Sequence, residues 1–396
     1  MKKILFLVQI LSCITVFGQS QDQNYIQKTI YRDSDTLSTI SKAITITYYD
    51  GLGRPIQQRA YGESATGKDI IVPMEYDAYG RPAKEYLPFV GQGASLNYDA
   101  NAISGQSTFY SSGTGSGNPT FETTAKPFSE KYYEASPLNR VLKQSSPGEA
   151  WALAVPATGS DRTVKQEYLY NDSQDNVRLF RANAVWNNSF RAYVPSLQYG
   201  TTVNYHAVNT LYKSVIKDED WTSYSGKEST TEIFKDKEGR VVLKRKFTLF
   251  GIIGGQNRYK AYDTYYVYDQ FGNLSYVLPP LASEIRTITE QKLTGLCYQY
   301  VYDHRNRLVE KRLPGKNWEF MVYDKQDRLI ASGPTLFPFG GNNLGWLITK
   351  YDAIGRQAYT GWYNGHMSIS SDNRIAMQLA MEASSTMNET RVSSNM

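Results

Sequence analysis

The residues of this 396-residue chain that could do chemistry recur as a pair, an aspartate with an arginine four positions later. Asp50 with Arg54 is the first pair, Asp77 with Arg81 is the second, and further copies follow. Carboxylates beside cations could act as general acids or bases, or could bind metal ions. A catalytic pair is seldom copied seven times in one chain, whereas a turn in a repeated fold must be. We therefore interpret these pairs as structural.

The other chemically capable side chains are scattered. His206, His304 and His366 lie far apart in sequence, and Cys297 is the only thiol beyond the N-terminal segment. Zinc and acid–base sites need several such groups together. The sequence has no nucleophile elbow, phosphate-binding loop or zinc-protease motif. The acidic run at 217–221 is typical of a solvated loop rather than a calcium site. We predict no catalytic residue, no metal and no cofactor.

Tryptophan offers a different kind of site, because exposed indole rings can stack on sugars. In a tyrosine-rich sheet protein, six tryptophans are also expected simply to pack within the hairpins, and we favour this interpretation. A glycan- or protein-binding module remains the alternative. The residues concerned are Trp151, Trp186, Trp221, Trp318, Trp346 and Trp362.

The elements that must position the aspartate–arginine pairs are β-hairpins. Residues 297–303, CYQYVYD, alternate between the two faces of a strand. Aspartate at the start of a type I turn accepts local backbone N–H groups, and glycine three residues later supplies a left-handed conformation. Asn306 and Asp327 replace that glycine in two copies, and both residue types tolerate the same region. We expect each arginine to pack on a tyrosine of the next hairpin.

The residues that we predict to form these turns have a structural role only. They are Asp50, Gly53, Arg54, Asp77, Gly80, Arg81, Asp236, Gly239, Arg240, Asp269, Gly272, Asp303, Arg307, Asp324, Arg328, Asp352, Gly355 and Arg356.

Composition agrees with a sheet protein. The chain has 32 tyrosines against 15 phenylalanines, and tyrosine suits half-buried sheet faces that keep a hydroxyl in water. The net charge of +5 is small and spread along the chain, so it gives no support for nucleic-acid binding.

The N-terminus has the pattern of a secretory signal peptide. Two lysines precede an apolar run from Ile4 to Phe17, and small residues precede a cut that we place after Gly18. The run is too short to span a bilayer comfortably, so we expect an exported mature chain without a transmembrane span. A lipid anchor on Cys13 is the less favoured alternative.

The segments YDQFGNL, YDHRNRLVEKRLPG and YDAIGRQ resemble the tyrosine-aspartate repeats of the Rhs family. Residues 46–89 are similar to the N-terminal domain of unknown function found in Rhs-like proteins of Bacteroidetes. The resemblance implies a β-sheet strip that spirals into a shell, often around a C-terminal toxic domain. The family's self-cleaving core, with its Asp-Pro-x-Gly motif, is absent from this sequence.

These observations predict an all-β fold, an antiparallel β-hairpin strip forming a curved sheet or partial shell. We expect a signal peptide at 1–18, an N-terminal domain with two hairpins at 24–90 and a flexible Gly/Ser/Thr-rich insertion at 91–127. A hairpin array at 128–366 follows, with one short helix within 278–300, and then an off-repeat tail at 367–396, for which a frayed helix is one interpretation. The expected role is a non-catalytic exported scaffold. Its expected partner is a polypeptide cargo, or a downstream Rhs core or toxin domain.

Overall fold

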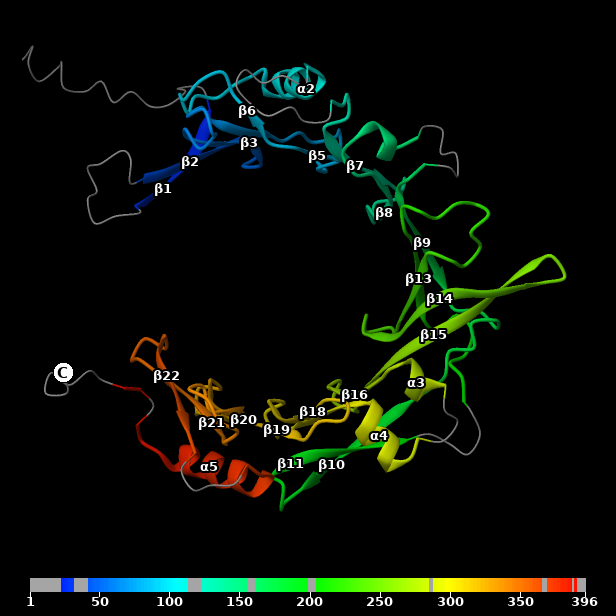
Figure 1. Ribbon diagram of the computed structural model, residues 1–396, viewed down its shortest axis with the longest axis vertical. Coiled ribbons are helices and arrows are strands. Elements are labelled where there is room, and N and C mark those ends of the chain that lie inside the picture. Colours follow the sequence, from blue (N-terminus) through cyan, green and yellow to red (C-terminus); the bar gives the residue numbers. More distant parts are fainter. Residues whose placement is uncertain are drawn as a thin grey trace, which may run out of the picture. The chain divides into compact units, whose positions relative to one another are not determined.

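The structure is a computed structural model that describes residues 23–31, 42–112, 123–154, 161–198, 204–284, 288–364, 369–386 and 388–389. Its chain divides into two compact units. Unit 1 comprises Met1–Gln166 with Lys217–Gly226, and unit 2 comprises Glu167–Ile216 with Lys227–Met396. Each unit is considered by itself (Figure 1). The predicted signal peptide, with Cys13, lies outside the described residues.

Unit 1 is built from antiparallel strands. Five of them form a sheet in the order β1-β2-β3-β4-β6, and β5, β7, β8 and β9 pair in that order. Alternation in KAITITYY directs Ile46 and Tyr48 of β2 into the core, where neither has any exposed surface. The strands are β1 (Asn24–Tyr31), β2 (Lys42–Tyr49), β3 (Pro55–Ala60), β4 (Ile70–Pro73), β5 (Lys84–Tyr86), β6 (Phe89–Val90), β7 (Phe128–Tyr133), β8 (Val141–Gln144) and the first residues of β9 (Val164–Tyr170), whose remainder from Glu167 belongs to unit 2.

The region 91–127, for which we predicted a flexible insertion, contains helix α2 (Ala102–Ser112) instead. Its packing corrects that prediction for these residues. Ala102 packs with Ile71 and Phe89, and buried Gln106 donates hydrogen bonds to the carbonyl oxygens of Leu87 (3.1 Å) and Pro127 (2.7 Å). The Gly/Ser-rich composition obscured a helix that is fixed by one buried amide and a few apolar contacts.

Unit 2 is an open antiparallel sheet that grows hairpin by hairpin from β13 to β22. A separate hairpin, β10 with β11, joins it where Tyr193 pairs with Tyr302. The all-β, antiparallel-hairpin prediction is confirmed. The strands are β10 (Arg181–Asn187), β11 (Ala192–Gln198), β12 (Tyr212–Lys217), β13 (Thr230–Lys235), β14 (Val241–Ile253), β15 (Gln256–Tyr268), β16 (Leu274–Leu278), β17 (Tyr298–Tyr302), β18 (Leu308–Arg312), β19 (Trp318–Tyr323), β20 (Leu329–Leu336), β21 (Leu344–Tyr351) and β22 (Gln357–Tyr363).

The core of unit 2 lies on one face of the sheet, which is covered by short helices and by the β10–β11 hairpin (Figure 1). One cluster packs Tyr265 and Leu278 of the sheet against Ala282 of α3 (Pro280–Ser283) and Leu293 of α4 (Glu290–Leu296). The single helix predicted within 278–300 is thus two helices. Pro280 opens the first, where its missing N–H costs nothing.

A second cluster covers the C-terminal part of the same sheet. Phe320 and Trp346 pack with Met377 and Met381 of α5 (Ser371–Ala383), a well-formed helix in the region predicted as an off-repeat tail. The side chain of Ser370 caps this helix by accepting a hydrogen bond from the Asn373 backbone N–H. No described helix is long and apolar enough to cross a membrane.

Candidate functional site

Each predicted turn residue lies at a turn between two consecutive strands, and the turn at Asp303 shows the common geometry. Its Oδ1 accepts hydrogen bonds from the backbone N–H groups of Arg305 (2.8 Å) and Arg307 (3.0 Å). Its Oδ2 accepts a hydrogen bond from the Arg307 Nε (2.7 Å), while Asn306 takes a left-handed φ of 58°. The carboxylate therefore holds the turn and fixes the arginine side chain.

The same contacts recur in the other copies. Glycine takes the left-handed position in five turns, with φ between 76° at Gly53 and 84° at Gly272 and Gly355. The turn at Asp269 differs from the others because its fifth residue is Asn273 and not arginine. The Asn273 side-chain amide donates to the Asp269 Oδ2 at 3.4 Å. The six turns with an arginine have Asp Oδ2–Arg Nε distances of 2.7–2.8 Å.

Successive turns are bound to one another through arginine and tyrosine. The Arg307 guanidinium lies over the ring of Tyr323, which precedes the next turn, at 5.1 Å. The hydroxyl of Tyr323 donates a hydrogen bond to the carbonyl oxygen of Leu308, the residue that follows that arginine (2.8 Å). The stacked turns of unit 2, at Asp236, Asp269, Asp303, Asp324 and Asp352, are called the turn ladder below.

The arginine contact was expected, whereas the tyrosine hydrogen bond was not. The hydroxyl always reaches the carbonyl one residue beyond the arginine position of the preceding turn, including Tyr302, where that position is Asn273. These hydrogen bonds are Tyr76 to Pro55 (2.9 Å), Tyr133 to Pro82 (3.4 Å), Tyr268 to Val241 (3.0 Å), Tyr302 to Leu274 (3.0 Å) and Tyr351 to Leu329 (2.9 Å).

The left-handed position also touches the preceding turn. A Cβ added to Gly80 would lie 2.9 Å from the Arg54 Nη1, so a side chain there would displace the arginine. Where this position is not glycine, its side chain forms a hydrogen bond with the side chain that reaches it from the preceding turn. Arg307 Nη1 thus donates to the Asp327 Oδ1 at 2.9 Å. Glycine at this position therefore makes room for the guanidinium, and asparagine or aspartate binds it.

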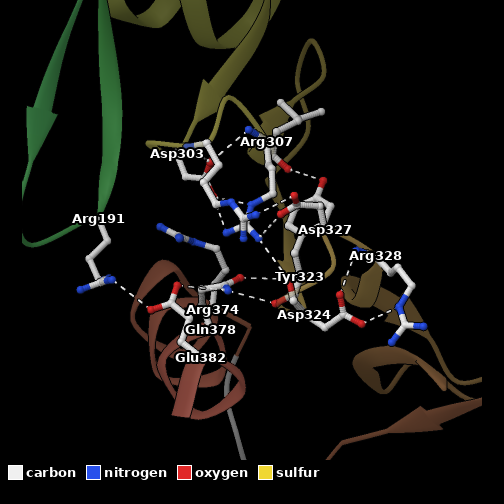
Figure 2. A network of polar contacts seen from close by, with 12 residues as sticks. Arg191, Asp303, Arg307, Tyr323, Asp324, Asp327, Arg328, Arg374, Gln378 and Glu382 are labelled. Atoms are coloured by element: carbon white, nitrogen blue, oxygen red, sulfur yellow. Dashed lines mark hydrogen bonds and ion pairs between the residues drawn. The ribbon is translucent and has the colours of Figure 1, made fainter. Parts of the chain in front are cut away.

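Helix α5 clamps the turn ladder from the helix-covered face, as Figure 2 shows. The buried Arg374 donates through Nε and Nη2 to the Glu310 Oε1 of β18 (3.1 and 3.0 Å). Gln378 accepts a hydrogen bond from the Tyr323 backbone N–H (2.9 Å) and donates one to its carbonyl oxygen (3.0 Å). The sequence did not predict these contacts of α5, because Arg374 and Gln378 lie outside the tyrosine-aspartate repeats.

Chemically reactive groups do not converge in the described residues. No cluster of three or more His, Cys, Asp or Glu side chains that could bind a metal occurs there. Cys297 is buried, and burial raises the pKa of its thiol to about 11. His304 lies against Trp186, and His366 is outside the described residues. Trp346 is buried and the other five tryptophans are half-buried; four of the six lie in strands, whereas Trp151 and Trp221 lie outside them.

Comparison with known proteins gives one family match. Residues 21–170 match the model of a domain of unknown function, DUF6443, which spans strands β1 to β9. The matched range includes the segment that resembles the N-terminal domain of Rhs-like proteins. No curated protein matches the chain.

Among solved structures, the chain is similar to Tc toxin complexes. The crystal structure of TcdB2-TccC3-TEV has 13% identity and a TM-score of 0.47, with coverage of 96% of this chain and 16% of the other. That of TcdB2-TccC3 has 13% identity, a TM-score of 0.47 and coverage of 87% and 14%. A Photorhabdus luminescens Tc holotoxin pore has 12% identity, a TM-score of 0.45 and coverage of 90% and 14%. The chain spans about a sixth of the length of the first of these.

Removing one tyrosine hydroxyl tests the ladder. Tyr323→Phe keeps the ring beneath Arg307 but leaves the Leu308 carbonyl without this donor, so we expect a loss of about 1 kcal/mol in the free energy of unfolding. Urea denaturation measures this difference. Tyr224→Phe is the control, because Tyr224 is 91% exposed and should not respond. Equal effects of the two substitutions would contradict the assignment.

Acid should destabilise unit 1 through its paired carboxylates. Hydrogen bonds from Arg140 hold the pKa of Glu134 at about 2, below its ordinary value of 4.5. Hydrogen bonds from the Arg54 backbone N–H and side chain lower the pKa of Asp50. A lowered folded-state pKa stabilises above the unfolded value, and the stabilisation is lost as pH falls through the folded value. We therefore expect the melting temperature to fall between pH 4.5 and about 2.

Glu134→Gln should remove part of this acid response, whereas Glu219→Gln, at an exposed loop position, should leave it intact. Thermal melts of the two variants and the parent across that pH range make the comparison. An unchanged acid response in Glu134→Gln would refute the role of this carboxylate.

Proposed function

We propose that this chain is a non-catalytic wall segment that encloses or presents another polypeptide. The observation that carries the proposal is the turn ladder, in which the tyrosine before each turn donates a hydrogen bond to the carbonyl oxygen just beyond the preceding turn. Because every hairpin is braced by its neighbour, contacts between adjacent hairpins add to the core on the covered face in holding the sheet extended. Such a sheet can form a wall.

The face of the sheet opposite the helices supports this role. Tyr266, Tyr298 and Tyr300 share it, since Tyr266 pairs with Val277 and Val277 pairs with Tyr298. Burial raises the pKa of the Tyr300 hydroxyl, and the nearby Tyr298 acts in the same direction. Lys311, which pairs with Tyr300, adds a charge to this face. We call these four residues the tyrosine face. Half-buried tyrosines with a polar tip suit contact with a polypeptide chain.

By the resemblance to the Rhs family, the cargo that we propose is a toxic polypeptide or another secreted domain. Export, which rests on the N-terminal signal pattern, is part of the same proposal. The alternative, a surface module that binds glycans through tryptophan, has less support because none of the six tryptophans is exposed.

Protection from protease tests the proposal. The chain is fused at its C-terminus to a protease-sensitive polypeptide, which should be cleaved about tenfold more slowly than when fused to an unrelated domain. The double variant Tyr298→Glu with Tyr300→Glu should lose this protection. Leu281→Glu, at a 69% exposed position on α3, is the matched control and should retain it. Equal cleavage rates in every fusion, with the sheet still folded, would exclude the proposed role.

A further inference from the structure

The hairpin formed by β14 and β15 extends beyond the strands on either side of it (Figure 1). β13 pairs with β14 only as far as Lys246, and β16 pairs with β15 only from Tyr265 onward. Residues 247–264 therefore form a projecting hairpin of two strands, called the ribbon below, and Gly254 and Gly255 form its turn. Two strands alone bury little apolar surface, so the side chains near the turn are left to water or to a partner.

The end of the ribbon is apolar. Phe250, Ile252 and Ile253 are 66%, 66% and 59% exposed, and we call these three residues the apolar tip. Large apolar side chains that are exposed singly are common, but three of them at one projecting turn indicate a contact surface.

Cationic side chains lie directly behind the apolar tip. Arg258 pairs with Gly251 and Lys260 pairs with Thr248, which are two and four residue pairs behind Ile253. The two cations occupy alternate positions of β15, so they point to the same face of the ribbon. At about 3.3 Å per residue, Arg258 lies about 7 Å and Lys260 about 13 Å behind the end of the tip.

This positive charge is hardly compensated. No aspartate or glutamate occurs within 239–262. Within the described part of the chain, Arg258 forms no ion pair, and Lys260 pairs with the exposed Glu284 at 3.0 Å. Exposed ion pairs of this kind hold their partners weakly. The ribbon thus presents an apolar end with positive charge close behind it.

The surface of an anionic bilayer matches this order of groups. Segments that bind at a bilayer interface bury apolar side chains about 5–10 Å into the boundary between headgroups and acyl chains. With the apolar tip at that depth, Arg258 reaches the lipid phosphates, and Lys260 lies within the negative potential of the surface.

A protein partner fits the ribbon less well. The three side chains of the apolar tip expose roughly 400 Å² together, which is half of the area that each partner buries in a stable protein interface. A second copy of this chain would bring the same positive charge against Arg258 and Lys260 and would be repelled.

We propose that the ribbon docks the chain on an anionic membrane surface. The apolar tip enters the bilayer interface, and Arg258 and Lys260 bind the phosphates of lipid headgroups. This proposal is independent of the proposed cargo, because no residue of the ribbon belongs to the tyrosine face.

A fluorescent label at the tip tests the proposal on the full chain. In a Cys13→Ser background, Ile253→Cys takes a nitrobenzoxadiazole label, whose emission rises in apolar surroundings, while the buried Cys297 stays unlabelled. Vesicles of phosphatidylcholine with about 30% phosphatidylglycerol should raise the emission about threefold, and vesicles of phosphatidylcholine alone much less. The label reports only its own surroundings, so vesicle binding through the apolar N-terminal run gives no signal.

A label in another exposed turn is the matched control. Phe339 is 86% exposed in the turn between β20 and β21, and no charged residue occurs within 329–349. Phe339→Cys, labelled in the same background, should show no increase in emission with either kind of vesicle.

Two sets of substitutions separate the apolar from the charged contribution, each with the label at position 253. Phe250→Ser combined with Ile252→Ser should remove most of the emission increase. Because both side chains are exposed, thermal melts of this variant should match those of the parent.

Arg258→Gln combined with Lys260→Gln should raise the half-saturating lipid concentration about tenfold. Lys237→Gln combined with Lys316→Gln removes two exposed lysines of unit 2 outside the ribbon and should leave that concentration unchanged.

Four results would overturn the proposal. The first is no emission change at position 253 with the anionic vesicles, and the second is an equal change at position 339. The third is an equal response to both kinds of vesicle, which would remove the role of the charges. The fourth is the same emission increase without vesicles, either as the chain is concentrated or on adding polyglutamate, which would assign the ribbon to a second copy or to an acidic polypeptide.

Discussion

Arg374→Ala is expected to lower the free energy of unfolding by about 3–5 kcal/mol. The arginine side chain is 1% exposed and bonds the Glu310 carboxylate, and its Nη2 also donates to the Phe190 carbonyl oxygen at 2.5 Å. Its removal leaves Glu310, itself only 7% exposed at the side chain, as a buried charge with no cation beside it. Urea denaturation of the variant and the parent protein measures the difference.

The cause can be separated from simple loss of volume. The double variant Arg374→Leu with Glu310→Leu removes both charges and should recover most of the loss, because apolar pairs replace buried ion pairs well. Arg191→Ala breaks the partly exposed pair with Glu382 on the same helix and should cost about 0.5 kcal/mol. A change below about 1 kcal/mol in Arg374→Ala would show that α5 does not depend on this contact.

The clamp also explains why α5 could not be predicted from sequence. An amphipathic helix is recognised by an apolar stripe, but two of the residues that α5 buries are Arg374 and Gln378. Their partners, Glu310 and Tyr323, lie 64 and 55 residues away. Nothing local shows that a charged residue will be buried, so the sequence indicated at most a frayed helix in an off-repeat tail and not a packed one.

The turns were predictable for the opposite reason. The contacts of Asp303 with Arg305 and Arg307 fall within five residues, so backbone preferences and side-chain types decide them. The contact of an arginine with the next tyrosine could also be expected, because most copies carry both residues, the copy at Asp269 with its Asn273 being one exception. The Tyr323 hydroxyl bond to Leu308 depends on how neighbouring hairpins are aligned, and sequence alone does not give that register.

Asp303→Ala is the second large effect that we expect, a loss of about 3 kcal/mol in the free energy of unfolding. The side chain is 5% exposed and accepts two backbone hydrogen bonds and one from Arg307. After the substitution, these donors are buried without this acceptor. The Arg307 guanidinium keeps Asp327 but loses the partner that holds it over Tyr323. Urea denaturation again provides the measurement.

Asp352→Ala is the matched control, because the turn at Asp352 has the same three hydrogen bonds. Its arginine, Arg356, is 74% exposed, against 8% for Arg307. Water can replace the lost acceptor there, so the effect should be much smaller. If the two substitutions instead destabilised equally, each turn would be acting alone, and the stacking of one turn on the next would add nothing to stability. A larger loss of unfolding free energy at Asp303 would mean that burial by the adjacent turns increases the contribution of this turn to stability. The proposed wall segment needs this coupling between neighbouring hairpins.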